Sequence, residues 1–184
     1  MAEVVHSELI DGVYTITPQV FDDDRGFFVE TYRREWIPKS SREMLQANRG
    51  DRQAGCIVGL HYHLHQADYW YVPFGTVRVV LHDLRVGSPT EGGTIETNLD
   101  GTDHRGLFIP PGVAHGFASL TDATITYLVD SYYNSADELG VAWDDPEVNA
   151  EWGVANPVLS KRDANNPLLK NIENHLRPSY GLRN

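Results

Sequence analysis

Residues 55–75 read GCIVGLHYHLHQADYWYVPFG, and this stretch indicates the fold of the whole chain. It combines β-branched and aromatic residues, which favour strands, with histidines at every second position. Alternate side chains of a strand point to the same face, so His61, His63 and His65 are expected on one face. Because imidazole titrates near neutral pH and also binds metal ions, that face would be a proton-transfer site or a metal site. Single surface histidines are common, but three of them between apolar and aromatic flanks favour a functional face.

Similar β-prone runs, separated by Gly and Pro turns, continue on both sides of this stretch. Three aspartates with Arg25 and Gly26 predict a turn before a strand at residues 27–32. Further strands are expected within residues 4–17, 76–101, 107–109 and 124–134. About ten short strands with little helix indicate an all-β fold of the barrel or jelly-roll type.

The remaining segments are expected to connect or cover the strands. Residues 36–45 predict a short helix capped by Ser40 or Ser41, and the polar residues 46–54 would then lead into the central strand. From residue 143 onward the sequence is loop-like. This extension, residues 143–184, is expected to pack on the outside of the barrel.

Composition limits the classes of function. The chain has 184 residues, enough for one domain with a substantial core over residues 1–184. A single cysteine, Cys56, excludes an internal disulfide, and the sequence contains neither a signal-peptide pattern nor a membrane span, so a cytoplasmic protein is expected. The formal charge of −11 disfavours nucleic-acid binding, which needs a basic surface. A phosphorylated small ligand would need only local arginines.

Six separated motifs occur in order along nearly the whole chain: FxDxRGFFxE, GLHY, DLRxGSPT, IPPGxAHGF, WDDP and LSxRD. In these motifs the chain resembles the dTDP-4-dehydrorhamnose 3,5-epimerase family. The resemblance implies a cupin-like jelly-roll β-barrel with a few short helices, mainly near the C-terminus. It also implies a homodimer built partly by exchange of the N-terminal strands within residues 1–35. No cofactor is required in that family, and the substrate is a dTDP-linked 4-keto-6-deoxyhexose.

The resemblance also implies roles for individual residues. His61, in GLHY, would remove the proton next to the 4-keto group, and Asp163, in LSxRD, would orient its imidazole. A base oriented by a buried acid is the expected pairing, because the acid fixes the tautomer and stabilises the imidazolium. Tyr127 would be the acid on the opposite face. The substrate-binding positions would be Phe21, Arg25, Glu30, Gln46, Asn48 and His115.

Two positions depart from the family pattern inside the site. The family reads RGLHYQ, and Val58 replaces its arginine, while Asp68 stands where the pocket lysine is expected. An acid at this position repels a developing negative charge. These changes also create the spacing of a metal-binding cupin, in which His61, His63, Asp68 and His115 would hold a divalent iron, manganese, nickel or zinc ion. Such an ion could stabilise the enolate in place of the lysine.

Three functions are therefore compatible with the sequence. The first is an epimerase of a dTDP-linked 4-keto sugar, and the second is a metal-dependent cupin enzyme of altered chemistry. The third is a sugar-nucleotide binder without catalysis. The first predicts that solvent deuterium enters C3 or C5 of a keto sugar. The second predicts that activity depends on a metal ion, and the third predicts nucleotide binding without deuterium exchange. The sequence leaves open which carbon is inverted.

Overall fold

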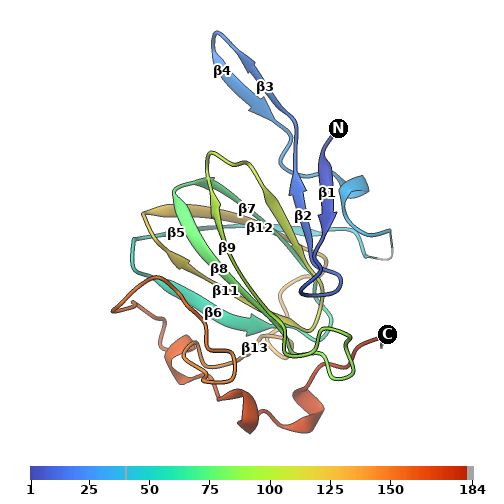
Figure 1. The fold of residues 1–184 in the computed structure, drawn as a ribbon, viewed down its shortest axis with the longest axis vertical. Helices are drawn as coiled ribbons and strands as arrows, with labels where there is room; N and C mark the ends of the chain where they lie inside the picture. The colour runs from blue at the N-terminus through green and yellow to red at the C-terminus, as the bar shows by residue number, and fades with distance from the viewer. Residues whose placement is uncertain (40, 182–184) are drawn as a thin grey trace.

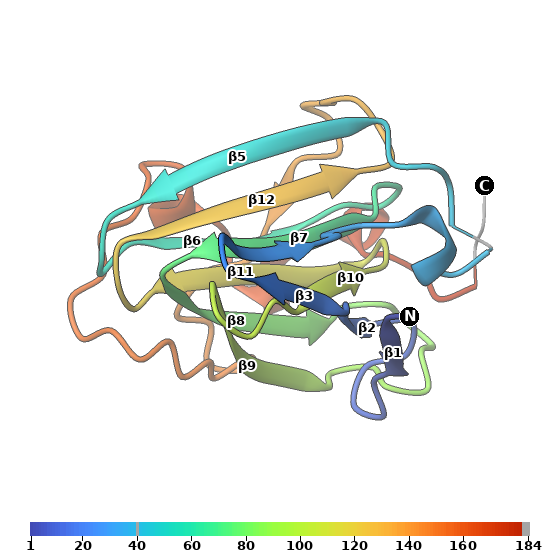
Figure 2. The same cartoon turned by 90° about the horizontal axis from the view of Figure 1, so that it is seen from above.

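The computed structural model describes residues 1–39 and 41–181. Short strands form two antiparallel sheets that pack against each other. A separate two-stranded hairpin, β3–β4, projects from them (Figure 1, Figure 2). The first sheet has the strand order β1-β2-β10-β7-β12-β5, and the second has the order β13-β6-β11-β8-β9. The strands are β1 (Glu3–His6), β2 (Tyr14–Thr17), β3 (Val20–Asp23), β4 (Gly26–Val29), β5 (Gln46–Arg52), β6 (Ile57–Tyr62), β7 (Asp68–Phe74), β8 (Thr76–Asp83), β9 (Thr94–Asp100), β10 (Gly106–Ile109), β11 (Val113–Ser119), β12 (Ala123–Val129) and β13 (Leu139–Gly140). The described part of the chain also contains four short 3-10 helices: η1 (Arg34–Trp36), η2 (Asp163–Asn165), η3 (Leu169–Asn171) and η4 (Asn174–Leu176).

The main core lies between the two sheets. In β8, Val77, Val79 and Leu81 point into it, and they pack with Trp70 of β7 and Ile125 of β12 from the other sheet. The valine at position 80 alternates to the opposite face of β8. Full burial of each such aliphatic side chain contributes about 1.5–3 kcal/mol, so this layer provides much of the stability that holds the sheets together.

The C-terminal segment covers the outer face of the second sheet, below β6 and β13 in Figure 1. Trp152 and Ile172 pack there against Leu60 and Tyr62 of β6. The hydroxyl of Tyr62 donates a hydrogen bond to the carbonyl of Leu176 at 3.0 Å. Strand β6 is therefore covered on both faces, which explains its apolar sequence around His61.

The predicted all-β fold with short helices mainly near the C-terminus is confirmed, and two local predictions are wrong. The predicted helix at residues 36–45 is absent: η1 ends at Trp36, and the described residues after it form a loop. The guanidinium of Arg34 holds the carbonyls of Pro38 and Ser41 in this loop. The predicted cap Ser40 lies outside the described residues. Residues 46–52 form strand β5 at a sheet edge, where polar side chains are tolerated. Among the described residues, no helix is long and apolar enough to cross a membrane.

Candidate active site

A β-bulge determines the direction of the His61 side chain. His61 pairs with His115 of β11, and the register shifts at the next residue pair. Gly59 permits the shift, because its φ is +120° and a Cβ there would lie 2.7 Å from the Cα of Gly116. Both sequence neighbours of His61 pack in the outer-face cluster. His61 therefore points toward the space between the sheets.

Asp163 holds the imidazole of His61. Nε2 of His61 lies 2.6 Å from Oδ1 of Asp163, across 102 residues of sequence. The His61 side chain is 19% exposed and the Asp163 side chain 4%. Because the carboxylate contacts Nε2, Nδ1 is the nitrogen left to take a proton from a substrate.

Asp163 remains ionised despite its burial. Burial alone would raise its pKa, but hydrogen bonds from His61, Ser160 and the backbone of Gly59 outweigh this effect, and the pKa lies below the usual 3.8. A buried carboxylate that stays negative stabilises positive charge on the adjacent ring. The pair therefore has the electrostatics of a general base with its orienting acid.

Tyr127 faces the same interior from the other sheet. It lies on β12, opposite Asn48 of β5, and its ring packs against the core between the sheets. Burial raises the pKa of Tyr127, and the charges of Asp68 and Glu138 raise it further. The phenol thus keeps its proton at neutral pH and can donate it. His61 and Tyr127 come from opposite sheets, as a base and an acid acting on opposite faces of one carbon would.

Two polar residues of β5 continue the tyrosine side of this interior. Gln46 and Asn48 are half-buried, and the amide of Gln46 donates a hydrogen bond to Oδ1 of Asn48 at 2.8 Å. Asn48 is the cross-strand partner of Tyr127, so the two side chains share one face. Both of these predicted substrate-binding residues therefore lie near the candidate acid.

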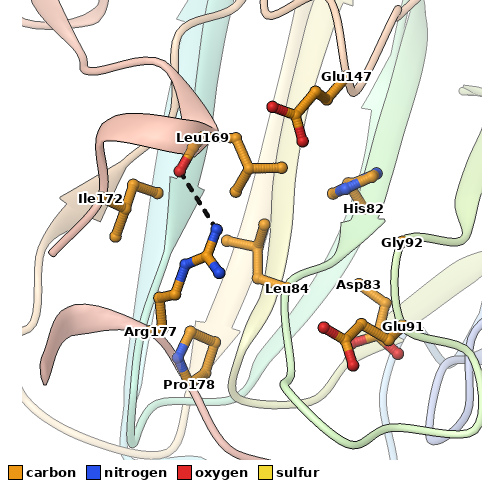
Figure 3. A pocket seen from close by; sticks show the side chains of 10 residues that line it. All are labelled: His82, Asp83, Leu84, Glu91, Gly92, Glu147, Leu169, Ile172, Arg177 and Pro178. Carbon is orange, nitrogen blue, oxygen red and sulfur yellow. Dashed lines mark hydrogen bonds between the residues drawn. The ribbon is translucent and has the colours of Figure 1, made fainter. Parts of the chain in front are cut away.

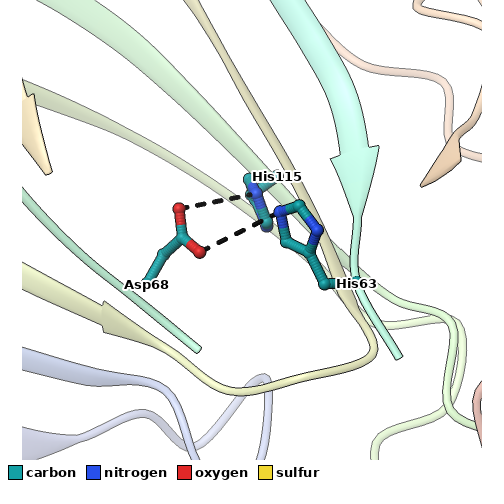
Figure 4. Close-up of side chains that lie close together, drawn as sticks. All are labelled: His63, Asp68 and His115. Carbon is teal, nitrogen blue, oxygen red and sulfur yellow. Dashed lines mark ion pairs between the residues drawn. The ribbon is translucent and has the colours of Figure 1, made fainter. Parts of the chain in front are cut away.

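His63, Asp68 and His115 form a second, buried cluster (Figure 4). Nε2 of His63 lies 4.0 Å from Oδ1 of Asp68, and Nε2 of His115 lies 3.9 Å from Oδ2. Burial lowers the pKa of His115 to about 4, so its imidazole is neutral at neutral pH. His61 was expected in the same metal set but lies outside this cluster, since its Nε2 is held by Asp163.

Sequence reasoning missed the residues that fix this cluster. His63 donates from Nδ1 to the carbonyl of Asp137 at 2.7 Å. Gln66 Nε2 and Trp70 Nε1 donate to the two oxygens of Asp68, at 3.0 and 3.1 Å. Trp70 could have been found, because it lies two positions from Asp68 on a strand and so on the same face. Asp137 lies in a loop far along the chain, and no pattern in its neighbouring sequence indicates that it contacts this cluster.

His65 does not share a face with the other two histidines, so that prediction is wrong for His65. Strand β6 ends at Tyr62, and the chain turns immediately afterwards. The carboxylate of Asp137 accepts hydrogen bonds from the backbone N–H groups of Leu64 and His65, at 2.6 and 3.2 Å. This turn breaks the alternation and leaves the His65 side chain exposed.

Three of the predicted substrate-binding residues, Phe21, Arg25 and Glu30, lie on or beside the β3–β4 hairpin, which projects from the sheets (Figure 1). The Arg25 side chain is 89% exposed and pairs with Asp23 of the same hairpin at 2.5 Å. Glu30 pairs with Arg33 at 3.3 Å, and Phe21 is exposed. Within the described part of the chain, one copy therefore does not bring these residues to His61.

A pocket of about 290 Å³ lies elsewhere, on the outer side of β8 (Figure 3). His82 and Leu84 line it from the strand, and Leu169, Ile172 and Arg177 line it from the C-terminal segment. The His82 side chain points away from the interior, since its neighbour at position 81 packs in the main core. The pocket is therefore separate from the His61 site.

Comparisons with known proteins identify the family of the chain. The family model for dTDP-4-dehydrorhamnose 3,5-epimerase matches residues 7–171. The dTDP-4-dehydrorhamnose 3,5-epimerase of Shigella flexneri is 37% identical over 169 residues, which cover 88% of this chain and 93% of that protein. The dTDP-4-dehydrorhamnose 3-epimerase of Streptomyces niveus is 36% identical over 179 residues, covering 93% and 86%.

The fold is also that of solved epimerases. The dTDP-6-deoxy-D-glucose-3,5-epimerase of Legionella pneumophila Philadelphia 1, solved in complex with dTDP-4-keto-L-rhamnose, has a TM-score of 0.91 and 31% identity to this chain. The match covers 99% of this chain and 100% of that one. The resemblance read from the six motifs is thereby confirmed, and the chain belongs to the dTDP-4-dehydrorhamnose 3,5-epimerase family.

Proposed function

We propose that this chain epimerises a dTDP-linked 4-keto-6-deoxyhexose, at C3 alone or at C3 and C5, with His61 as the base. The 2.6 Å contact between His61 Nε2 and Asp163 carries this proposal, together with the placement of Tyr127 on the facing sheet. Relatives include both a 3,5-epimerase and a 3-epimerase, so the scaffold accommodates either outcome. The single Cys56 fits a reducing compartment, and we place the reaction in the cytoplasm.

In the proposed reaction, Nδ1 of His61 takes the proton from the carbon next to the ketone. The electron pair of the broken C–H bond forms the enolate, with its negative charge on the former carbonyl oxygen. Asp163 stabilises the imidazolium that results. The hydroxyl of Tyr127 then donates a proton to the opposite face of the same carbon, which restores the ketone with inverted configuration. Proton transfer from the imidazolium to the phenolate resets the site.

The enolate requires positive charge or hydrogen-bond donors near its oxygen. The family's arginine and lysine positions hold Val58, which packs against the main core, and Asp68, which is 3% exposed. The half-buried amides of Gln46 and Asn48 are donors on the Tyr127 side of the interior. These amides offer polar contacts without net charge, so enolate stabilisation by side chains alone is weaker here than in the family pattern.

We also propose that two copies pair and exchange the β3–β4 hairpin. The hairpin exposes Phe21, Phe27 and Phe28, and an apolar element that projects from the sheets favours burial in a partner. In such a dimer, Arg25 would reach the partner's site. Mixing two inactive variants, His61→Asn and Arg25→Ala, tests this arrangement. Hybrid dimers with one intact site would restore about a quarter of the activity of the unmodified protein. A monomer in light scattering, or no recovery on mixing, would refute the exchange.

The reaction itself is tested with dTDP-4-keto-6-deoxyglucose in deuterated buffer. NMR follows C3 and C5 separately, so that one experiment reports activity and position. The expected result is deuterium at C3, or at both carbons, together with inversion. Calorimetry with dTDP measures nucleotide binding by the same protein. Nucleotide binding without any deuterium exchange would mean that the chain binds the nucleotide but does not catalyse the reaction, and would overturn the proposal.

A further inference from the structure

Three hydrogen-bond acceptors converge in the buried cluster of His63, Asp68 and His115 (Figure 4). Nδ1 of His63 donates to the carbonyl of Asp137 at 2.7 Å, and Nδ1 of His115 donates to the carbonyl of Val113 at 3.0 Å. A neutral imidazole that donates from Nδ1 carries a lone pair on Nε2. Both lone pairs belong to the nitrogens nearest to Asp68, which lie 4.0 and 3.9 Å from its oxygens.

The charge of Asp68 is weakly compensated in this arrangement. Its two oxygens accept hydrogen bonds from Gln66 and Trp70, and both donors are neutral. The residue is 3% exposed, so water solvates it poorly. A buried carboxylate is costly unless a cation or a proton balances it. Two imidazole lone pairs and a poorly compensated carboxylate therefore favour one positive charge bound between them.

We propose that His63, Asp68 and His115 bind one divalent transition-metal ion through the two Nε2 atoms and a carboxylate oxygen. Two imidazoles and a carboxylate are ligands for zinc, iron, cobalt, nickel or manganese. The ligand atoms lie within 4.8 Å of one another, so some point lies within about 2.8 Å of all three, against roughly 2.0–2.2 Å for bound zinc. Movements of each side chain by about 0.6–0.8 Å toward that point complete the site.

The contacts around the cluster resemble the outer shell of a metal site. Histidine ligands in such sites donate their other ring nitrogen to a carbonyl or carboxylate, and ligating carboxylates accept further hydrogen bonds. The Nδ1 bonds of His63 and His115 and the two donors to Asp68 supply these contacts. Three protein ligands leave positions on the ion open to other molecules.

A metal at this place would act beside the proposed acid, and this part of the inference rests on the proposed function. Tyr127 of β12 pairs with Trp70 of β7, and Trp70 shares its strand face with Asp68, to which its ring N–H donates a hydrogen bond. An ion on Asp68 would reverse the local charge from negative to positive. It would thereby supply the positive charge that the lysine supplies in the family pattern, where an enolate oxygen needs it.

The test begins with elemental analysis of the full chain purified without added metal or chelator. Metal is then removed by dialysis against a chelator, and Co²⁺ is titrated while its visible absorption bands are recorded, followed by Zn²⁺ competition. One equivalent per chain is expected. His63→Gln and Asp68→Asn each remove one ligand, and each is expected to weaken Co²⁺ binding more than the roughly 100-fold loss typical of an outer-shell change. His65→Gln, an exposed histidine two residues away, serves as the matched control and is expected to leave binding unchanged.

Less than a tenth of an equivalent of metal, with Co²⁺ absorption that is the same in His63→Gln as in the unmodified protein, would overturn the site. Deuterium exchange is measured on the same samples to separate the two proposals. Exchange without metal binding would refute the site alone, whereas stoichiometric metal without nucleotide-sugar exchange would refute the epimerase and leave the site standing.

Discussion

Replacing Asp163 by Asn tests the coupling between the base and its orienting acid. The substitution keeps the size of the side chain but removes the charge that lies 2.6 Å from Nε2 of His61. A hydrogen bond to a charged group contributes about 1.5–3 kcal/mol, and both side chains are largely buried, so solvent screens the interaction little. The imidazolium forms only during the reaction, so this energy is lost mainly from the transition state. Since about 1.36 kcal/mol corresponds to a tenfold change in rate, kcat is expected to fall about 10- to 150-fold.

The assay is the initial rate of deuterium incorporation at C3 of dTDP-4-keto-6-deoxyglucose, measured over a range of substrate concentrations. The loss is expected in kcat, with KM nearly unchanged, because Asp163 contacts the base rather than the substrate. Asn165→Ala is the matched control: it removes an exposed side chain of the same 3-10 helix, whose amide donates to the carbonyl of Lys161, and it keeps the Asp163 carboxylate. A change in kcat of less than about twofold in Asp163→Asn would refute the reasoning, since the pair would then have no catalytic role.

Three further predictions concern the acid, the bulge and the stability at low pH. Tyr127→Phe is expected to lower net inversion by about 10²- to 10⁴-fold while deuterium exchange by the base persists, and equal loss of both in NMR would contradict an acid role. Gly59→Ala is expected to cost at least about 1–3 kcal/mol in urea unfolding, because its Cβ would meet backbone; Gly87→Ala, with φ +80° but open space, is the control and should cost less. Asp83 is buried and paired with Arg85 at 2.7 Å, and Asp83→Asn is expected to cost about 3–5 kcal/mol. Burial would raise the pKa of Asp83, but hydrogen bonds, chiefly from Arg85, lower it below 3.8, so its contribution is present above pH 3.8 and is lost as the pH falls through the folded pKa. Asp83→Asn should therefore reduce the slope of the unfolding free energy against pH below pH 3.8. An unchanged slope would contradict this assignment.

The sequence indicated the strands well where side chains alternate between core and surface. Strand β8 is an example, because each of its inward valines has an outward neighbour. Strand β5 was missed because an edge strand that carries polar residues on both faces lacks this signal. The predicted helix at residues 36–45 failed because Arg34 fixes its carbonyls in a loop, and that contact is tertiary.

The predictions for the candidate site show the same difference between local sequence signals and tertiary contacts. The contact of His61 with Asp163 could be expected only from family resemblance, since 102 residues separate the two and composition carries no trace of the pairing. The exposure of His65 depends on a turn held by Asp137, which comes from a distant loop. Likewise, the division of the four expected metal ligands into a base and a three-residue cluster depends on the bulge at Gly59 and on the C-terminal segment that carries Asp163.

The most direct test compares His61→Asn with His65→Asn in deuterated buffer. Both substitutions remove an imidazole from the same segment, but only His61 faces the interior and contacts Asp163. The expected result is loss of deuterium incorporation at C3 and C5 in His61→Asn, at unchanged dTDP affinity, with the rate of the unmodified protein in His65→Asn. Deuterium incorporation in His61→Asn at the rate of the unmodified protein would contradict the assignment of His61 as the base.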